Sequence, residues 1–483
     1  MLSDTSVVDI YHLIQQDPIH VDLSAYPTAL TESQNVDSLM AHLLKFGAVE
    51  SLNLSGMKAD ADVLQCVMRS AESGGAAYLT DLNLRNTHTS PIQLTRLLQT
   101  LKTRAPLLTT LDIGENSLGD TAVASLSGFF PPTLQSLGIG SNSLSAAAVT
   151  KILESLTNAK LTALARLELS DNHFDIKSSE ALKTLLTTTD CQTTLKELLV
   201  AHCRLDEANS PCLAEGVHAS AIEVLDLSRN NCLLSFIFAA DETHPVAFPT
   251  SLRALDLSGN ACQRGALRGL VESLHGCSDH IEELYLGRTF QGDAALQTFL
   301  SGIVSMPALR VLDLSDCGLT YRSGKVLAQQ LPMHSQLAVI RLSHNMLEVE
   351  GVMDMTSGLE RLCRLMSLEL GSCNLRNCGA VAVVTSLLRS GAPIRQLDIS
   401  DNVINNAGLR EVCALLSRLT CPRLQRLIIS RNPCTKESQA NLIEMIQSRQ
   451  STCQVVADYT PLDEVANQSL SIATASASHL TQV

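Results

Sequence analysis

The chain has 483 residues, of which 45% are hydrophobic and only 3% aromatic, and it contains no Trp. This composition is typical of a folded protein, and it predicts a core built mainly from aliphatic side chains. The net charge of −14 comes without a basic stripe, which argues against binding to nucleic acid or to anionic membranes, because both need a cationic face.

The sequence has no run of 18 apolar residues, and its first residues, MLSDTSVVDIYHLIQQD, lack a basic start. We therefore expect no membrane insertion and no signal peptide. The 15 cysteines show no matched CxxC pairs, which predicts free thiols in a reducing compartment and no zinc site. We expect a cytoplasmic protein, either free or associated with the cytoskeleton, without a metal or a cofactor.

Residues 1–48 are predicted to form an N-terminal cap. They hold one divergent repeat, with Val21 and Leu23 as its buried pair, and a helix near residues 36–45. The first strand of a stacked sheet has an unpaired edge, so the chain needs a polar cap to close it.

Residues 49–450 repeat the pattern L-x-x-L-x-L-x-x-N/C-x-L fourteen times, with 26 to 31 residues between successive starting points. The copies begin at Val49, Leu79, Leu108, Leu134, Leu164, Leu195, Ile222, Leu252, Ile281, Leu309, Leu337, Leu365, Ile394 and Leu424.

The two central apolar positions of the pattern are aliphatic in every copy, and the residue between them varies. Alternation with a period of two predicts a short strand with one buried face. A segment with helical spacing follows, as in Leu409, Val412 and Leu416. Helices are wider than the strand spacing, so stacked copies must bend toward their strands. The predicted fold is an α/β leucine-rich-repeat solenoid, a horseshoe with a parallel sheet on its concave face and helices on its convex face.

The ninth position of the pattern holds Asn in eight copies and Cys in three others. Stacked in register, these side chains can satisfy backbone groups in the turn that leaves each strand, which makes the position structural. They are Asn116, Asn142, Asn172, Asn230, Asn260, Asn345, Asn402 and Asn432, with Cys203, Cys317 and Cys373.

Repeats of about 28 residues with Asn and Cys sharing the turn position resemble the ribonuclease-inhibitor-like leucine-rich-repeat family over residues 18–435. The motif is specific for the fold and much less so for function. The resemblance implies a non-catalytic scaffold or adaptor that binds another protein.

Two regions depart from the repeat. The connector over residues 233–252 lacks clear helical periodicity and carries Phe236, Phe238 and Phe248. It is predicted either to be an extended segment that buries its own aromatic rings or to form a secondary contact loop. Residues 451–483 are predicted to be a C-terminal extension, with a final strand in CQVVADY and disorder from residue 461. Its last residues, Thr481 to Val483, resemble a ligand of PDZ domains.

The residues that flank the buried strand positions point into the concavity, where a partner would bind. Acids occupy seven of the twelve central outward positions from Asp112 to Ile428. An acidic sheet attracts a basic protein partner, but LxLDLS is also common in this repeat class whatever the repeat binds, so both interpretations stay open.

Tyr285, Val311 and Val339 form a predicted apolar island on adjacent strands within that face, a candidate binding hot spot. The complete candidate set is Asp226, Asp256, Tyr285, Arg288, Val311, Asp313, Val339, Arg341, Glu369 and Asp398.

The sequence contains no phosphate loop, HExxH, GxSxG or GxGxxG motif, so we expect no enzyme activity and no catalytic residue. Two alternatives to the adaptor remain. One is a structural subunit of a cytoskeletal or axonemal assembly. The other is a Ran-type GTPase-activating protein, since that family shares the repeat, although this chain ends in SIATASASHLTQV and not in an acidic tail.

Overall fold

The computed structural model describes residues 19–25, 49–57, 61–72, 76–188, 191–238, 245–262, 264–303, 306–416, 424–435, 440, 443–444 and 453–457. The chain divides into two compact units, residues 1–252 and 253–483. Each unit is built from the same strand-and-helix repeat.

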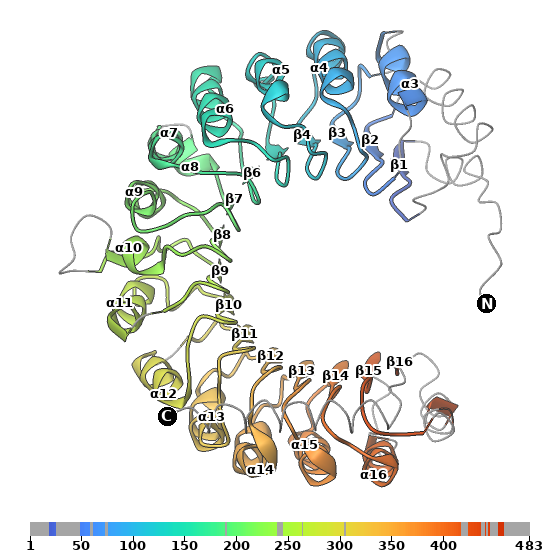
Figure 1. Cartoon of the computed structure of the whole chain (residues 1–483), viewed down its shortest axis with the longest axis vertical. Helices are drawn as coiled ribbons and strands as arrows, with labels where there is room; N and C mark the ends of the chain where they lie inside the picture. The colour runs from blue at the N-terminus through green and yellow to red at the C-terminus, as the bar shows by residue number, and fades with distance from the viewer. Residues whose placement is uncertain are drawn as a thin grey trace, which may run out of the picture. The chain divides into compact units, whose positions relative to one another are not determined.

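Among its described residues, the first unit has eight three-residue strands, each paired in parallel with the next along the chain (Figure 1). They are β1 (His20–Asp22), β2 (Ser51–Asn53), β3 (Asp81–Asn83), β4 (Thr110–Asp112), β5 (Ser136–Gly138), β6 (Arg166–Glu168), β7 (Glu197–Leu199) and β8 (Val224–Asp226).

The described part of the second unit repeats this arrangement with eight further parallel strands. They are β9 (Ala254–Asp256), β10 (Glu283–Tyr285), β11 (Val311–Asp313), β12 (Val339–Arg341), β13 (Ser367–Glu369), β14 (Gln396–Asp398), β15 (Arg426–Ile428) and β16 (Gln454–Val456).

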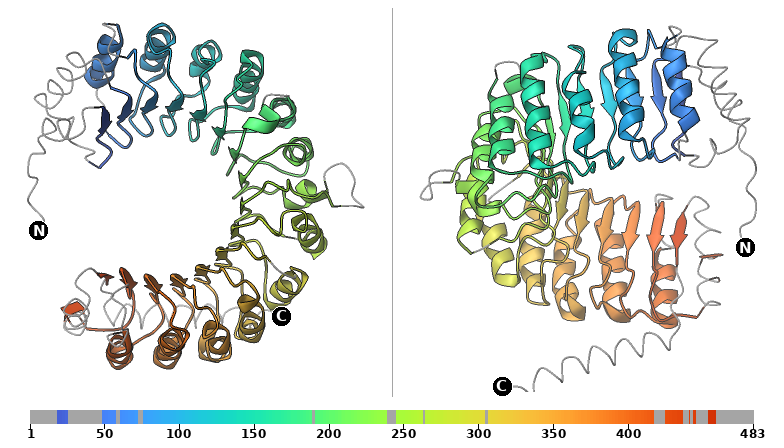
Figure 2. Two further views of the ribbon diagram at one scale, coloured as in Figure 1. Left: turned by 180° about the vertical axis from the view of Figure 1, so that it is seen from behind. Right: turned by 45° about the horizontal axis from the view of Figure 1, so that its top comes forward.

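Helices follow the strands and cover one face of the sheet in each unit, leaving the other face bare (Figure 2). In the first unit they are α3 (Ala61–Glu72), α4 (Pro91–Arg104), η2 (Asp120–Ala122), α5 (Val123–Ser127), α6 (Ala146–Ala159), α7 (Ile176–Thr187), α8 (Cys191–Thr194), α9 (Ser210–His218) and α10 (Leu233–Phe238). In the second unit they are α11 (Arg264–Leu274), α12 (Asp293–Gly302), α13 (Ser323–Gln330), η3 (Leu331–Met333), α14 (Glu348–Leu359), α15 (Arg376–Ser390) and α16 (Asn406–Leu416).

The core lies between the strands and the helices, as the aliphatic pattern predicts. The central residue of each strand from β1 to β15 is buried, and the residue before it is at least partly exposed. Leu284 of β10, for example, is 0% exposed. The predicted leucine-rich-repeat solenoid, with parallel strands on one face and helices on the other, is confirmed in each unit.

The Asn position of the repeat joins neighbouring repeats through buried hydrogen bonds. The Nδ2 of Asn345 donates to the carbonyl of Leu314 in the preceding repeat at 2.9 Å and to that of Leu342 at 2.8 Å. Its Oδ1 accepts from the backbone N–H groups of Cys317 and Leu319, both at 3.0 Å. One side chain thus satisfies four backbone groups, as the sequence predicts for this position.

Cysteine at the same position keeps only part of this network. The Sγ atoms of Cys317 and Cys373 donate to the carbonyls of Leu286 and Leu342 at 3.3 and 3.2 Å. Both are free thiols, and burial raises the pKa of Cys373 to about 12, so it packs as a neutral side chain. A thiol replaces the amide donor, but it has no carbonyl oxygen for the backbone N–H groups.

The irregular connector buries aromatic rings, as one of its two interpretations predicts. Phe236 and Phe248 are 0% and 2% exposed, and their ring centroids lie 6.1 Å apart. The ring of His218 lies 5.6 Å from Phe236 and 5.7 Å from Phe248. The connector is not extended throughout, because its first six residues form the helix α10.

Paired strands lie at both ends of the described repeat array. β1 pairs with β2, and β16 pairs with β15, so strands lie both before residue 49 and after residue 450. The helix expected near residues 36–45, the tail from residue 461 and the C-terminal motif Thr481 to Val483 all lie outside the described residues. The domain boundaries at residues 48 and 450 therefore stay predictions.

Replacing Asn345 with Ala should lower the free energy of unfolding by about 1–3 kcal/mol, because buried backbone groups lose their partners. Asn345→Cys should cost less, since a thiol at this position can still donate to the Leu314 carbonyl, as Cys317 does to Leu286. Urea denaturation followed by circular dichroism measures both changes. Equal stability of Asn345→Ala and the wild type would contradict a structural role for this position.

Candidate functional site

The bare sheet face of the second unit carries two parallel rows of side chains. The strand register aligns Asp256, Tyr285, Asp313, Arg341, Glu369 and Asp398 in one row, here called the central row. The residues two positions earlier on the same strands form the adjacent row, which contains Ala254, Glu283, Val311, Val339, Ser367 and Gln396. Residues two apart on a strand face the same side, so both rows point away from the helices.

Tyr285 is held in place by two charged neighbours. Its hydroxyl donates to Oε2 of Glu283 at 2.8 Å, and the guanidinium carbon of Arg341 lies 5.5 Å from the centre of its ring. That distance allows a cation–π contact. Burial, with the nearby Glu283 carboxylate, raises the pKa of Tyr285 to about 12. The ring is therefore a neutral, half-buried platform in a fixed orientation.

Arg341 connects three strands of the central row. Its Nε lies 3.2 Å from Oε1 of Glu369 on β13, and its Nη1 lies 3.9 Å from Oδ2 of Asp313 on β11. Burial raises the pKa of the Glu369 carboxyl even though the positive charge of Arg341 acts in the opposite direction. The central row thus has four carboxylates and a single guanidinium, and it remains acidic after this pairing.

The recurring Asp of the central row also has a local structural task. The Oδ1 atoms of Asp256 and Asp313 accept from the backbone N–H two residues later, each at 2.8 Å, and Asp398 does the same at 2.9 Å. Asn53 and Asn83 make this turn contact at the equivalent position of other repeats, at 3.1 and 3.0 Å. The contact needs a side-chain oxygen and no charge, so part of the Asp pattern belongs to the scaffold.

The strand register spreads the predicted apolar island over both rows. Val311 and Val339 are neighbours in the adjacent row, where they align with Glu283, while Tyr285 aligns with Asp313 and Arg341 in the central row. Tyr285 is thus a diagonal neighbour of Val311, a separation that an aromatic side chain can bridge. The role of these residues as a binding hot spot stays a prediction.

Two of the predicted residues lie outside these rows. Arg288 is on the loop after β10, where its side chain is 72% exposed and its Nε lies 2.6 Å from Oδ2 of Asp316. Asp226 is on β8 in the first unit, where its Oδ1 accepts from the N–H of Ser228 at 2.8 Å. The candidate site of the second unit is therefore the set Asp256, Tyr285, Val311, Asp313, Val339, Arg341, Glu369 and Asp398.

The sequence did not lead us to include Glu283 in the predicted site, although its carboxylate accepts the hydrogen bond of the Tyr285 hydroxyl. The signal was present, because a residue two positions before Tyr285 on the same strand must share its face.

Two acids of the first-unit strand face, Asp112 and Glu168, are paired with an arginine of the chain, which the sequence also did not reveal. Nη1 of Arg85 lies 2.8 Å from Oε2 of Glu168 and 3.8 Å from Oδ2 of Asp112. Gly138 leaves room for this network, since a Cβ there would lie 2.7 Å from Oδ1 of Asp112. The acidic surface is thus partly neutralised on β4–β6 and is less neutralised in the central row of the second unit.

Among the described residues, no group of three His, Cys, Asp or Glu side chains is arranged to hold a metal ion. Across the same part of the chain, no helix combines the length and the apolar character that a membrane crossing requires.

Comparison with known proteins identifies the repeat. A family model described as "Leucine Rich repeat" matches residues 105–127, 306–328 and 393–413. Ribonuclease inhibitor from Sus scrofa is 25% identical over 396 residues, which cover 75% of this chain and 86% of that protein. Ribonuclease inhibitor from Mus musculus is 31% identical over 205 residues, which cover 42% of this chain and 43% of that protein. The resemblance to ribonuclease-inhibitor-like leucine-rich-repeat proteins is therefore confirmed.

Other similar proteins share smaller parts or a more distant likeness. Mouse "Capping protein, Arp2/3 and myosin-I linker protein 3" is 30% identical over 256 residues, which cover 50% of this chain and 16% of that protein. Among solved structures, an internalin from Listeria monocytogenes aligns with a TM-score of 0.42 and 16% identity, over 75% of this chain and 89% of that chain.

Replacing Arg341 with Gln should raise the pKa of Glu369 further, because the Glu369 carboxylate loses its nearest positive charge while the acids Asp313 and Asp398 stay close. Burial already disfavours the ionised form of Glu369 in the folded state. The protonated side chain therefore contributes stability at acidic pH, and this contribution is lost as the pH rises through the folded pKa of Glu369. The variant should move that loss to higher pH. Carboxyl carbon shifts of labelled Glu residues measure the titration, and Arg361→Gln, a change at an exposed residue outside both rows, should leave it unchanged.

Proposed function

Because this chain is a leucine-rich-repeat protein of the ribonuclease-inhibitor-like kind, we propose that it binds a basic protein on the bare strand face of its second unit. Proteins built on this repeat generally act through protein–protein contacts. The observation that carries the proposal is the central row, in which four carboxylates on neighbouring strands surround a fixed tyrosine and a fixed arginine.

The charge of the row favours a cationic partner. One oxygen of Asp256, Asp313 and Asp398 is used by the local turn, and an ionised carboxylate has further lone pairs to accept hydrogen bonds from a partner. Acidic groups that line one face reinforce each other's potential and speed the encounter with a basic surface. The row therefore supports recognition of Lys and Arg side chains.

Tyr285 and Arg341 supply the anchors at the centre of the row. Binding energy at interfaces concentrates in a few residues, and Tyr and Arg are enriched among them. Glu283 and Glu369 already restrain these two side chains in the free protein. Because these side chains are already restrained, they lose less conformational entropy when a partner packs against them than mobile side chains would. Val311 and Val339 extend the contact with apolar surface beside the row.

A fixed role in a cytoskeletal assembly is the second candidate, favoured by the similarity to the linker protein whose name includes capping protein, Arp2/3 and myosin-I. Co-sedimentation of the purified chain with actin filaments and with microtubules tests this role. Retention in either pellet would support it, and the protein staying in the supernatant with both would count against it. Stimulation of GTP hydrolysis stays an untested alternative.

The adaptor proposal is tested by removing charge without disturbing the turns. The triple variant Asp256→Asn, Asp313→Asn and Asp398→Asn keeps the turn contact, because Asn53 and Asn83 already make it in this chain. For a partner captured by the wild type and then purified, the variant should show an association rate lower by about tenfold or more, with weaker dependence on salt. Surface plasmon resonance measures both quantities.

A matched control removes the same charge from helices of the same unit, with Glu272→Gln, Asp354→Asn and Glu411→Gln. This control should bind at the wild-type rate. Tyr285→Ala should weaken binding by about 1–3 kcal/mol if the ring is an anchor. Wild-type affinity in both the triple Asn variant and Tyr285→Ala would reject the strand face as the binding site.

A further inference from the structure

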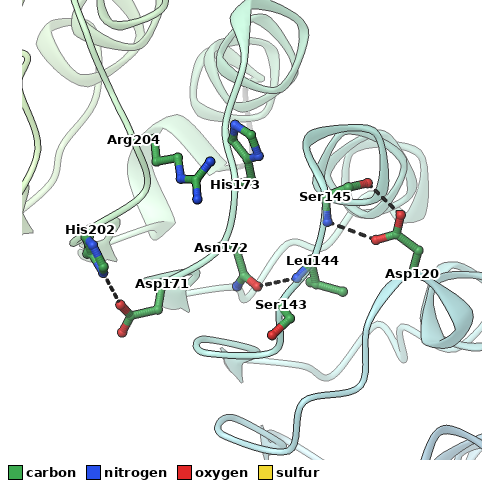
Figure 3. A pocket seen from close by; sticks show the side chains of 9 residues that line it. All are labelled: Asp120, Ser143, Leu144, Ser145, Asp171, Asn172, His173, His202 and Arg204. Carbon is green, nitrogen blue, oxygen red and sulfur yellow. Dashed lines mark hydrogen bonds and ion pairs between the residues drawn. The ribbon is translucent and has the colours of Figure 1, made fainter.

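A pocket of about 720 Å³ opens in the first unit, on the loops that follow β5, β6 and β7 (Figure 3). Ser143, His173 and Arg204 occupy equivalent positions on the three loops, and all three are exposed. The pocket lies beyond the ends of the strands and includes none of the residues assigned to the strand face of the second unit.

The two acids of the pocket are satisfied by neighbouring groups. The carboxylate of Asp120 accepts from the N–H of Ser145 at 2.9 Å and from its hydroxyl at 2.7 Å. Asp171 accepts from Nδ1 of His202 at 2.6 Å with one oxygen and from the Ser141 hydroxyl at 3.0 Å with the other. Each carboxylate oxygen of these acids thus has a partner within the protein, and Figure 3 shows the bonds to Ser145 and His202.

Three other polar side chains line the pocket, those of Arg204, His173 and Ser143. Within the described residues, the side chains of Arg204 and His173 make no hydrogen bond or ion pair, and neither does the hydroxyl of Ser143. Arg204 and His173 both line the pocket, and Figure 3 draws their side chains on neighbouring loops. The pocket therefore offers a permanent positive charge, an imidazole and a hydroxyl, while both of its carboxylates already accept hydrogen bonds from neighbouring groups.

Asn172, which also lines the pocket, is held by buried hydrogen bonds. Asn172 is 3% exposed, its Oδ1 accepts from the N–H of Leu144 at 3.0 Å, and its Nδ2 donates to the carbonyls of Ile139 and Leu169. These are the repeat-joining contacts of the Asn position, so they fix the spacing of the loops on which Ser143 and His173 lie.

We propose that this pocket binds an anionic side chain of a partner protein, a carboxylate or a phosphate monoester, through Arg204 and His173. The planar guanidinium of Arg204 can donate two parallel hydrogen bonds to either group. Imidazole and hydroxyl donors can satisfy the remaining oxygens. This site goes beyond the function proposed above, because it lies in the other unit and selects the opposite charge.

The test uses blocked tripeptides Ala-X-Ala in which X is phosphoserine, glutamate or alanine, added to the full chain and followed by isothermal titration calorimetry. We expect the phosphoserine or the glutamate peptide, or both, to bind, and the alanine peptide not to bind. Arg204→Gln should weaken binding by about tenfold, the size of one charge-assisted contact, and His173→Gln should weaken it less. The difference between the two anionic peptides identifies the anion that the pocket prefers.

The matched control is Arg229→Gln. Arg229 is an exposed arginine on the next loop, its φ of 56° resembles the 59° of Arg204, and it does not line the pocket. This variant has the same change of charge and of side chain, and it should bind like the wild type. The proposal is overturned if neither anionic peptide binds more tightly than the alanine peptide, or if Arg229→Gln weakens binding as much as Arg204→Gln. Thermal unfolding by circular dichroism checks that all three variants are folded.

Discussion

Every feature of this protein depends on hydrogen bonding between neighbouring repeats. A single strand and helix cannot bury the aliphatic pair of one repeat, so each copy is stable only when the next copy covers it. The parallel strand ladder supplies part of the connection, and the buried side chain at the Asn position supplies the rest. Asn345 illustrates how this position joins the repeats, since it serves backbone groups of its own repeat and of the one before.

The same constraint determines where function can lie. Because the inner positions of each strand are committed to the core, only the flanking side chains and the loops vary freely. The Asp of LxLDLS serves both the scaffold and the surface, since one of its oxygens holds the turn and its carboxylate carries charge on the strand face. Its recurrence therefore reflects both the scaffold and the surface charge, and the contribution of charge is visible only where no arginine of the chain neutralises it.

The two units use their charges differently. In the first unit, Arg85 pairs with the acids of the strand face, and the loops after β5–β7 leave Arg204 and His173 as open donors. In the second unit, Arg341 pairs with only part of the central row, which remains acidic around Tyr285. The two proposed sites therefore differ in the sign of the charge they recognise, so one partner with both kinds of charge or two different partners could be bound.

The sequence by itself determined the repeat, the strand-and-helix order, the buried positions and the structural role of Asn and Cys, because these follow from local periodicity and hydrogen-bonding chemistry. It also placed Tyr285 and the recurring acids on the bare face. Only the tertiary structure decided which of these side chains touch one another. The alignment of Tyr285 with Asp313 and Arg341, the reach of Arg85 to Glu168 and the grouping of loop residues in the pocket depend on strand register and on rotamers. The sequence of a single repeat determines neither the register nor the rotamers, because both arise from the packing of one repeat against the next.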